Sequence, residues 1–320
     1  MAHGEVTRRA LTAMIGAGAA WPLAASAIVL DPPGQFHLNI PGALDGPYAP
    51  PKTLATVADL YSRMTTKVLV NGQGPFAFVV DTGANQSVIS KALAERLGLP
   101  AGPTEALNGV AGSMMAPTTT AALAFGDISE PDVLMSILPG EAMGGDGILG
   151  LDRVEGQRLI MDFRRRTLSI ERRAARWRDP TDVVLKARRR DGQLTLVDAD
   201  LAGMRLVALL DSGAQMTIGN MALYQMALSR APTSVWTQTA ILSATGQTMM
   251  SHMADLPHLR LGTLHFPNWP VAFADLHTFR MWGMIDKPAI LLGVDVLSRF
   301  EYVSLDFARD EVRFRVPHEA

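Results

Sequence analysis

Apolar and β-branched runs separated by turn residues occur in the first half of the chain from residue 66 onward. Residues 66–70 and 76–80 are two such runs, and the Gly-containing turn between them predicts a β-hairpin. The second run leads directly into Asp81. Residues 90–97 then predict a short helix, which Gly98 ends.

The same order of elements returns in the second half. Residues 194–197 and 206–210 predict two strands with a turn near Gly203 between them, and the second strand leads into Asp211. Residues 219–228 predict the matching helix. The repeat indicates that the chain is built from two similar halves.

Two later landmarks also occur once in each half. An apolar-apolar-Gly sequence ends at Gly150 and again at Gly293, and an Asp-Phe pair follows at Phe163 and Phe307. Two copies are too few for a solenoid. The pattern therefore predicts a mainly β fold with two similar β-barrel lobes related by a pseudo-two-fold axis.

Each repeat carries an Asp-Thr/Ser-Gly-Ala sequence directly after its apolar strand, beginning at Asp81 and at Asp211. One copy alone is common by chance and would indicate only a strand that ends in a polar turn. Two copies in equivalent places indicate a functional pair. If the two loops meet, two carboxyls within hydrogen-bonding distance of each other share one proton.

The residues beside the aspartates suit this arrangement. Thr82 and Ser212 supply short hydroxyls that can brace the two loops against each other. Gly83 and Gly213 permit tight backbone geometry and leave room for a water and a substrate. In such a pair the charged carboxyl is a general base toward water, and the protonated carboxyl donates to the scissile carbonyl. This chemistry needs no metal and no other cofactor.

The paired sequences resemble the active-site loops of retropepsin-like aspartic proteases, in a single-chain bacterial form with two active-site halves. The resemblance covers residues 61–172 and 182–316. It implies two retropepsin-like lobes of the acid protease fold, catalytic roles for Asp81 and Asp211, and aspartic-type endopeptidase activity on peptide or protein substrates. It also implies a flap hairpin in each half. The flap candidates are Gly109, Val110, Ala111, Gly112, Ala244, Thr245 and Gly246.

The sequence departs from two better-known arrangements. Viral members of the family are usually homodimers with one half in each chain, whereas this chain carries both halves, so we expect an active monomer. Pepsin-like enzymes carry a tyrosine in the first flap, and residues 104–126 contain none. Two methionine pairs, at 114–115 and 249–250, fall in the flap regions. They indicate either ordinary packing or an adaptable apolar wall for substrate side chains.

The N-terminus has the features of an export signal. Arg8 and Arg9 precede an uncharged stretch, and residues 25–27 form a small-residue cleavage sequence. We interpret residues 1–27 as a twin-arginine-type signal, which predicts a periplasmic or exported protein. The alternative is an uncleaved membrane anchor, because residues 10–30 are long enough to span a bilayer.

Composition separates the remaining segments. A Pro-rich leader covers residues 28–60, and a short basic linker at residues 173–181 separates the lobes predicted at 61–172 and 182–320. The formal net charge of −2 gives no reason to expect a nucleic-acid partner. The absence of cysteine excludes disulfides and thiol catalysis.

The sequence also bears on a metal site, a non-catalytic module and an obligate dimer. The histidines, which include His252, His258, His265 and His277, show no metal-ligand spacing, so no metal site is predicted. A peptide-binding or scaffold module with the same fold and no chemistry remains the main alternative. An obligate dimer, in which each half pairs with another chain, is made unnecessary by the internal repeat.

Overall fold

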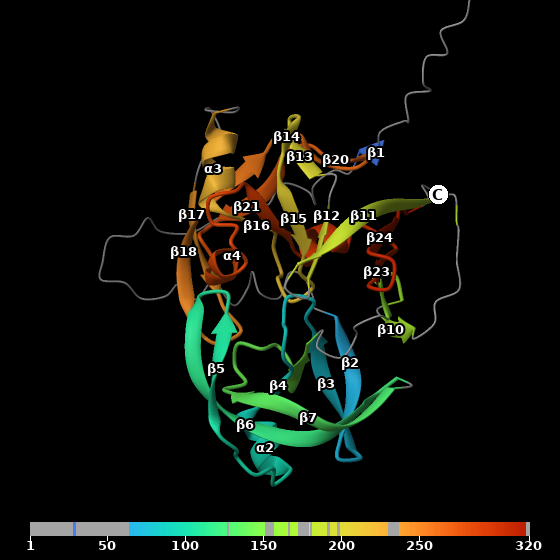
Figure 1. The fold of residues 1–320 in the computed structure, drawn as a ribbon, viewed down its shortest axis with the longest axis vertical. Coiled ribbons are helices and arrows are strands. Elements are labelled where there is room, and N and C mark those ends of the chain that lie inside the picture. Colours follow the sequence, from blue (N-terminus) through green and yellow to red (C-terminus); the bar gives the residue numbers. More distant parts are fainter. Residues whose placement is uncertain are drawn as a thin grey trace, which may run out of the picture.

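The computed structural model describes residues 28–29, 64–126, 128–150, 157–165, 167–171, 179, 181–190, 193–196, 199–229 and 237–317. The described chain forms two β-rich lobes, one above the other in Figure 1. The predicted export signal lies outside these ranges, as do most of the predicted leader and linker. None of the helices in these ranges is long and apolar enough to cross a lipid bilayer.

The first lobe is a seven-stranded sheet in the order β2-β3-β8-β4-β7-β6-β5. Its strands are β2 (Thr65–Val70), β3 (Gln73–Val80), β4 (Val88–Ser90), β5 (Thr104–Gly109), β6 (Gly112–Phe125), β7 (Ile128–Leu138) and β8 (Gly147–Leu149). β2 also pairs with β6, which curls the sheet toward a barrel. The expected hairpin over residues 66–80 is confirmed as β2 and β3.

The second lobe repeats this order as β12-β15-β22-β16-β21-β18-β17. Its strands are β12 (Gln193–Leu196), β15 (Val207–Leu210), β16 (Ile218–Gly219), β17 (Thr237–Leu242), β18 (Thr248–Leu256), β21 (Trp269–Phe273) and β22 (Ala289–Leu292). In both lobes, the strand before the aspartate pairs in parallel with the apolar-apolar-Gly strand, as β3 with β8 and β15 with β22. This equivalence confirms the mainly β, two-lobed fold.

The ends of the two halves meet in one sheet region. Its strands are β9 (Arg158–Asp162), β10 (Thr167–Glu171), β11 (Asp182–Arg190), β23 (Tyr302–Asp306) and β24 (Glu311–Arg315). β9 pairs with β23, so the last strands of each half lie side by side. The guanidinium of Arg158 forms an ion pair with Asp306 across this pairing, at 2.9 Å between Nη2 and Oδ2. Both side chains are buried, so the two lobes are joined by more than the linker.

A small sheet on the second lobe was not predicted. Its strands are β1 (Ile28–Val29), β13 (Ala199–Leu201), β14 (Met204–Arg205), β19 (Leu259–Leu261) and β20 (Leu264–Phe266). The expected turn near Gly203 exists, with φ of +86°, but it closes the extra hairpin β13-β14 rather than joining β12 directly to β15. Ala199 and Leu201 are buried where β13 pairs with β19. This burial stabilises the extra hairpin that the chain forms between β12 and β15.

The helices in the described ranges are α2 (Lys91–Arg96), α3 (Met221–Leu228), α4 (His277–Met281) and α5 (Val294–Leu297). α2 and α3 confirm the helices predicted over residues 90–97 and 219–228, whereas α4 and α5 were not predicted. α2 and α3 are equivalent in the two lobes, and each begins after a capping side chain, Ser90 or Asn220, that accepts a backbone N–H. Each helix buries one leucine, Leu93 or Leu223, against its own sheet. These helices thus hold the strands that carry the aspartates.

Candidate active site

The two aspartates occupy equivalent places at the ends of strands. Asp81 follows β3, and its backbone N–H donates to Leu149 O at 3.1 Å. Asp211 follows β15, and its N–H donates to Leu292 O at 3.0 Å. Both loops are thereby fixed to the neighbouring parallel strand, which is buried and apolar in each lobe.

Reciprocal hydrogen bonds lock the two loops together. The Thr82 hydroxyl donates to Leu210 O at 3.0 Å and accepts from the Ser212 N–H at 2.9 Å. The Ser212 hydroxyl donates to Val80 O at 2.8 Å and accepts from the Thr82 N–H at 3.1 Å. Thr82 and Ser212 are almost completely buried. Four bonds between buried groups fix the geometry of the loops across the two lobes.

Two glycines bring the carboxyls face to face. A Cβ atom on Gly83 would lie 2.9 Å from Cγ of Asp211, and one on Gly213 would lie closer still to the Asp81 carboxyl. Any side chain at either position would therefore collide with the opposite aspartate. Each carboxyl is also oriented within its own loop, because Gly83 N–H donates to Asp81 Oδ1 at 2.8 Å and Gly213 N–H donates to Asp211 Oδ1 at 2.9 Å.

The pKa of Asp211 favours a state in which the two carboxyls share one proton. Burial raises the pKa of Asp211 well above its ordinary value of 3.8, and the charge of the Asp81 carboxyl and its hydrogen bond to Asp211 raise this pKa further. Hydrogen bonds from the backbone N–H groups of Gly213 and Ala214 lower the pKa of Asp211. Asp211 is 5% exposed, whereas Asp81 is half-buried. The pair thus has a buried member that retains its proton and a more accessible partner.

The apolar-apolar-Gly sequences pack directly against the loops. A Cβ atom on Gly150 would lie 2.9 Å from Ala84 O, and one on Gly293 would lie 2.5 Å from the backbone carbon of Met216. Gly150 N–H donates to the Ser87 hydroxyl at 3.1 Å, and Gly293 N–H donates to the equivalent Thr217 hydroxyl at 3.2 Å. The glycines are therefore required for close contact between backbones.

Asp295 supports the second loop, and sequence reasoning gave it no role. It accepts a hydrogen bond from Thr217 Oγ1 at 2.8 Å and another from Trp269 Nε1 at 3.2 Å, and all three side chains are buried. Burial raises the pKa of Asp295 to about 6, while these hydrogen bonds favour its charged form. The available signal was an acidic residue inside the apolar run that follows Gly293.

Two hairpins occupy the predicted flap positions. The first flap is the hairpin β5-β6, whose turn contains Val110 and Ala111, and the second flap is β17-β18, whose turn contains Ala244, Thr245 and Gly246. Their tips touch each other, because a Cβ atom on Gly109 would lie 3.0 Å from the Thr245 side chain. Gly112 similarly lies beside Gln247. The flaps therefore meet across the two lobes.

The methionine pairs split between the two faces of the flaps. Met114 and Met249 point inward and pack against apolar clusters that also contain residues of the aspartate loops, Ala84 in one lobe and Met216 in the other. Met115 and Met250 lie on the outer faces and are exposed. Only the inner member of each pair is therefore placed to line a site beneath the flaps.

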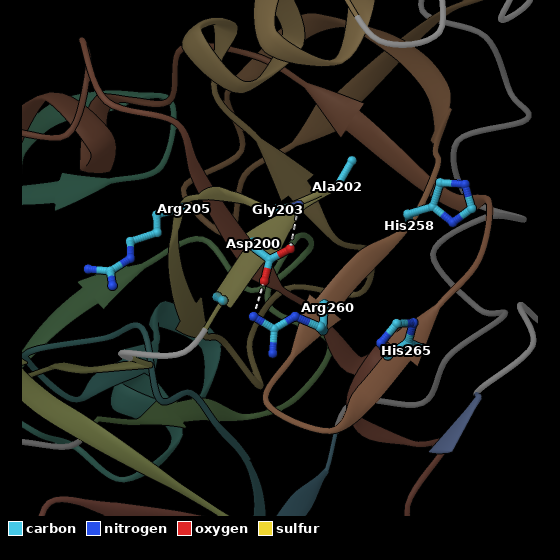
Figure 2. Close-up of a pocket in the computed structure, with 8 residues that line it drawn as sticks. Asp200, Ala202, Gly203, Arg205, His258, Arg260 and His265 are labelled. Atoms are coloured by element: carbon cyan, nitrogen blue, oxygen red, sulfur yellow. Dashed lines mark hydrogen bonds and ion pairs between the residues drawn. The ribbon is translucent and has the colours of Figure 1, made fainter. Parts of the chain in front are cut away.

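A separate polar pocket of about 460 Å³ lies on the small sheet of the second lobe (Figure 2). Asp200 accepts a hydrogen bond from the Gly203 N–H at 2.9 Å and forms an ion pair with Arg260, and His258 and His265 also line the pocket. Neither Asp81 nor Asp211 lies in it. Within the described ranges, no group of three or more His, Asp or Glu side chains is arranged to hold a metal ion.

Two lobes of one strand order, joined at paired Asp-Thr/Ser-Gly loops, define the fold of an acid protease. Family models agree with this assignment in each half. Residues 66–155 match the family described as "gag-polyprotein putative aspartyl protease", and residues 197–296 match the family described as "Aspartyl protease". No curated protein is matched by the sequence. The chain belongs to the retropepsin-like aspartyl proteases and carries two protease domains on one polypeptide.

Proposed function

We propose that the protein is an aspartic-type endopeptidase that hydrolyses peptide bonds with a water activated between Asp81 and Asp211. The observation that carries this proposal is the reciprocal bonding of the two Asp-Thr/Ser-Gly loops through Thr82 and Ser212. It holds two carboxyls face to face on rigid supports, which is the arrangement that general acid–base catalysis requires.

The raised pKa of Asp211 and the greater exposure of Asp81 support different roles for the two carboxyls. Asp211 retains a proton because its pKa is raised, so it is the acid that donates to the scissile carbonyl oxygen. Asp81 is the more accessible carboxylate, and it takes a proton from the water whose oxygen attacks the carbonyl carbon. When the C–N bond breaks, Asp81 passes its proton to the leaving amine, and Asp211 regains one from the hydroxyl of the intermediate. Both carboxyls end as they began.

The surroundings support an extended peptide as substrate. Two flap hairpins offer strand edges to a bound peptide, and the inner methionines, Met114 and Met249, offer adaptable apolar contacts beside the two loops. Because both aspartates lie on one chain, the proposed active unit is a monomer.

A peptide-library assay distinguishes the peptidase from a binding module of the same fold. Wild-type protein is incubated with a diverse peptide library between about pH 3 and 8, a range that brackets ordinary and raised carboxyl pKa values, and products are identified by mass spectrometry. We expect cleavage that peaks on the acidic side of neutrality and falls when Asp211 loses its proton. Saturable peptide binding without cleavage at any pH would reject the peptidase in favour of the binding module.

A further inference from the structure

The tip of the first flap is bound to the opposite lobe. The carbonyl oxygen of Val110 accepts a hydrogen bond from the backbone N–H of His277, the first residue of α4, at 2.7 Å. The Val110 side chain packs against the apolar cluster that includes Phe279 of the same helix. The tip of β5 lies beside α4 in Figure 1. The first flap is therefore held at its tip as well as at its base.

A second hydrogen bond joins the same two elements through side chains. The Ser113 hydroxyl lies 3.1 Å from His277 Nε2 and donates to Asn108 Oδ1 at 2.5 Å. A hydroxyl has one proton, so Ser113 accepts from His277, whose Nε2 must carry hydrogen. Both the neutral Nε2–H tautomer and the imidazolium satisfy this requirement. The contact is therefore available in either charge state of the ring.

The flap also completes the start of α4. The first N–H groups of a helix have no partner within the helix. Leu276 precedes α4 and provides no side-chain capping bond. The Val110 carbonyl supplies an acceptor in its place, so the contact orders the helix and the flap together.

The bound tip packs against the same apolar cluster as a residue of the second aspartate loop. Val110 packs in one cluster with Met216, which belongs to the loop that begins at Asp211. Ala244 of the second flap packs in another cluster with Ala84, which directly follows Gly83 of the first loop. Each flap tip thus packs against a cluster of the opposite lobe that also contacts a residue of that lobe's aspartate loop.

We propose that α4 is a latch for the first flap, and that His277 must release Val110 and Ser113 before a substrate can reach the aspartates. The role of the latch in catalysis rests on the proposed peptidase function, but the latch itself is a physical contact that can be tested without a substrate. His277 is thus a positioning residue for the flap.

Access beneath the flap can be measured by thiol labelling. The chain has no cysteine, so Met216→Cys introduces a single thiol beside the cluster against which Val110 also packs. The labelling rate of this thiol with a small disulfide reagent reports how often the tip lifts. All latch variants are made in this background, and none of the readouts requires peptide cleavage.

The decisive variant is His277→Pro. Proline is favoured at the first position of a helix, and Leu276 already has the extended φ of −57° and ψ of 144° that a residue before proline requires. The proline removes the N–H that binds Val110, puts a ring carbon in its place, and removes the imidazole. We expect labelling at least about tenfold faster. His277→Ala keeps the backbone N–H and removes only the side-chain hydrogen bond to Ser113. It should raise the labelling rate about fivefold, which corresponds to the loss of a net hydrogen bond of ~1 kcal/mol.

Controls separate latch release from damage to the lobe. Arg280→Ala changes an exposed residue of the same helix and should leave the labelling rate unchanged. Hydrogen exchange should rise in residues 104–125 and stay constant in α3. If α3 also exchanges faster in His277→Pro, a double-mutant cycle of His277→Ala with Ser113→Ala decides instead. The latch predicts that Ser113→Ala increases the labelling rate by a smaller factor when His277 is Ala than when His277 is present.

Two results would overturn the latch. One is His277→Pro labelled at the parental rate in a folded protein, and the other is independent, multiplicative effects of His277→Ala and Ser113→Ala. Absence of peptide cleavage would reject the proposed function and leave these rates unaffected.

Discussion

The buried carboxyl of Asp295 makes a testable contribution to stability. Its pKa is about 6 in the folded protein against an ordinary value of 3.8. Between these values the folded state binds one more proton than the unfolded state, so the free energy of unfolding falls as pH rises through this window. Two pKa units correspond to about 3 kcal/mol. The contribution is fully present below pH 3.8 and is lost above about pH 6.

Asp295→Asn removes this titration at nearly constant side-chain volume. The amide nitrogen of asparagine cannot accept a hydrogen bond, so either Thr217 Oγ1 or Trp269 Nε1 loses its acceptor, and the variant should be less stable than the parent at pH 4 by about 1–3 kcal/mol. Between pH 4 and pH 7.5 the carboxyl of Asp295 ionises, so the parent loses the stability that the protonated carboxyl contributed. The variant has no ionisable group at this position, so its stability does not change for this reason. The difference in unfolding free energy between parent and variant should therefore shift in favour of the variant by about 2–3 kcal/mol.

Urea unfolding of both proteins at pH 4, 5, 6 and 7.5 measures this shift. Taking the difference between parent and variant at each pH cancels the titration of groups that both share. A difference that stays constant from pH 4 to 7.5 would refute the reasoning, because it would mean that Asp295 has the same pKa in the folded and unfolded states.

Three further predictions follow from the two-lobed site. Thr82→Ala leaves the Ser212 N–H without its acceptor and should lower the unfolding free energy by about 2–4 kcal/mol, as measured by urea unfolding, with a conservative Thr82→Ser restoring most of it. Peptidase activity per chain should be constant on dilution, and a steep fall together with dissociation in sedimentation would reject the monomeric site. In a bacterial host, residues 1–27 should be missing from periplasmic protein, and replacing Arg8 and Arg9 by lysine should block its delivery; normal delivery would indicate another route.

The pairing of the loops could be predicted because its signal is local. Each aspartate follows a run of five apolar residues, and a strand of that kind is readable from composition. The repeat then implied that Asp81 and Asp211 occupy equivalent places. The structure brings these loops together through Thr82 and Ser212, the residue types that the motif had singled out.

Features that depend on pairing between distant segments could not be predicted. β9 pairs with β23, which lies in the other half of the chain, and β13 pairs with the distant strand β19, yet neither partner is encoded by a local pattern. The role of Asp295 required knowing that Trp269 lies beside it. Likewise, His277 has no unusual sequence neighbours, and only the fold places it against the first flap.

The proposal that Asp81 and Asp211 act as one catalytic unit is tested most directly by measuring peptide cleavage by single Asn variants. Asp81→Asn and Asp211→Asn are assayed at the pH optimum of the parent, with Asp255→Asn as a matched control outside the pair. Circular dichroism and urea unfolding establish that each variant is folded. We expect loss of nearly all cleavage in both variants of the pair and parental activity in the control. A folded Asp81→Asn or Asp211→Asn protein that cleaves peptides at the parental rate would contradict a catalytic role for the pair.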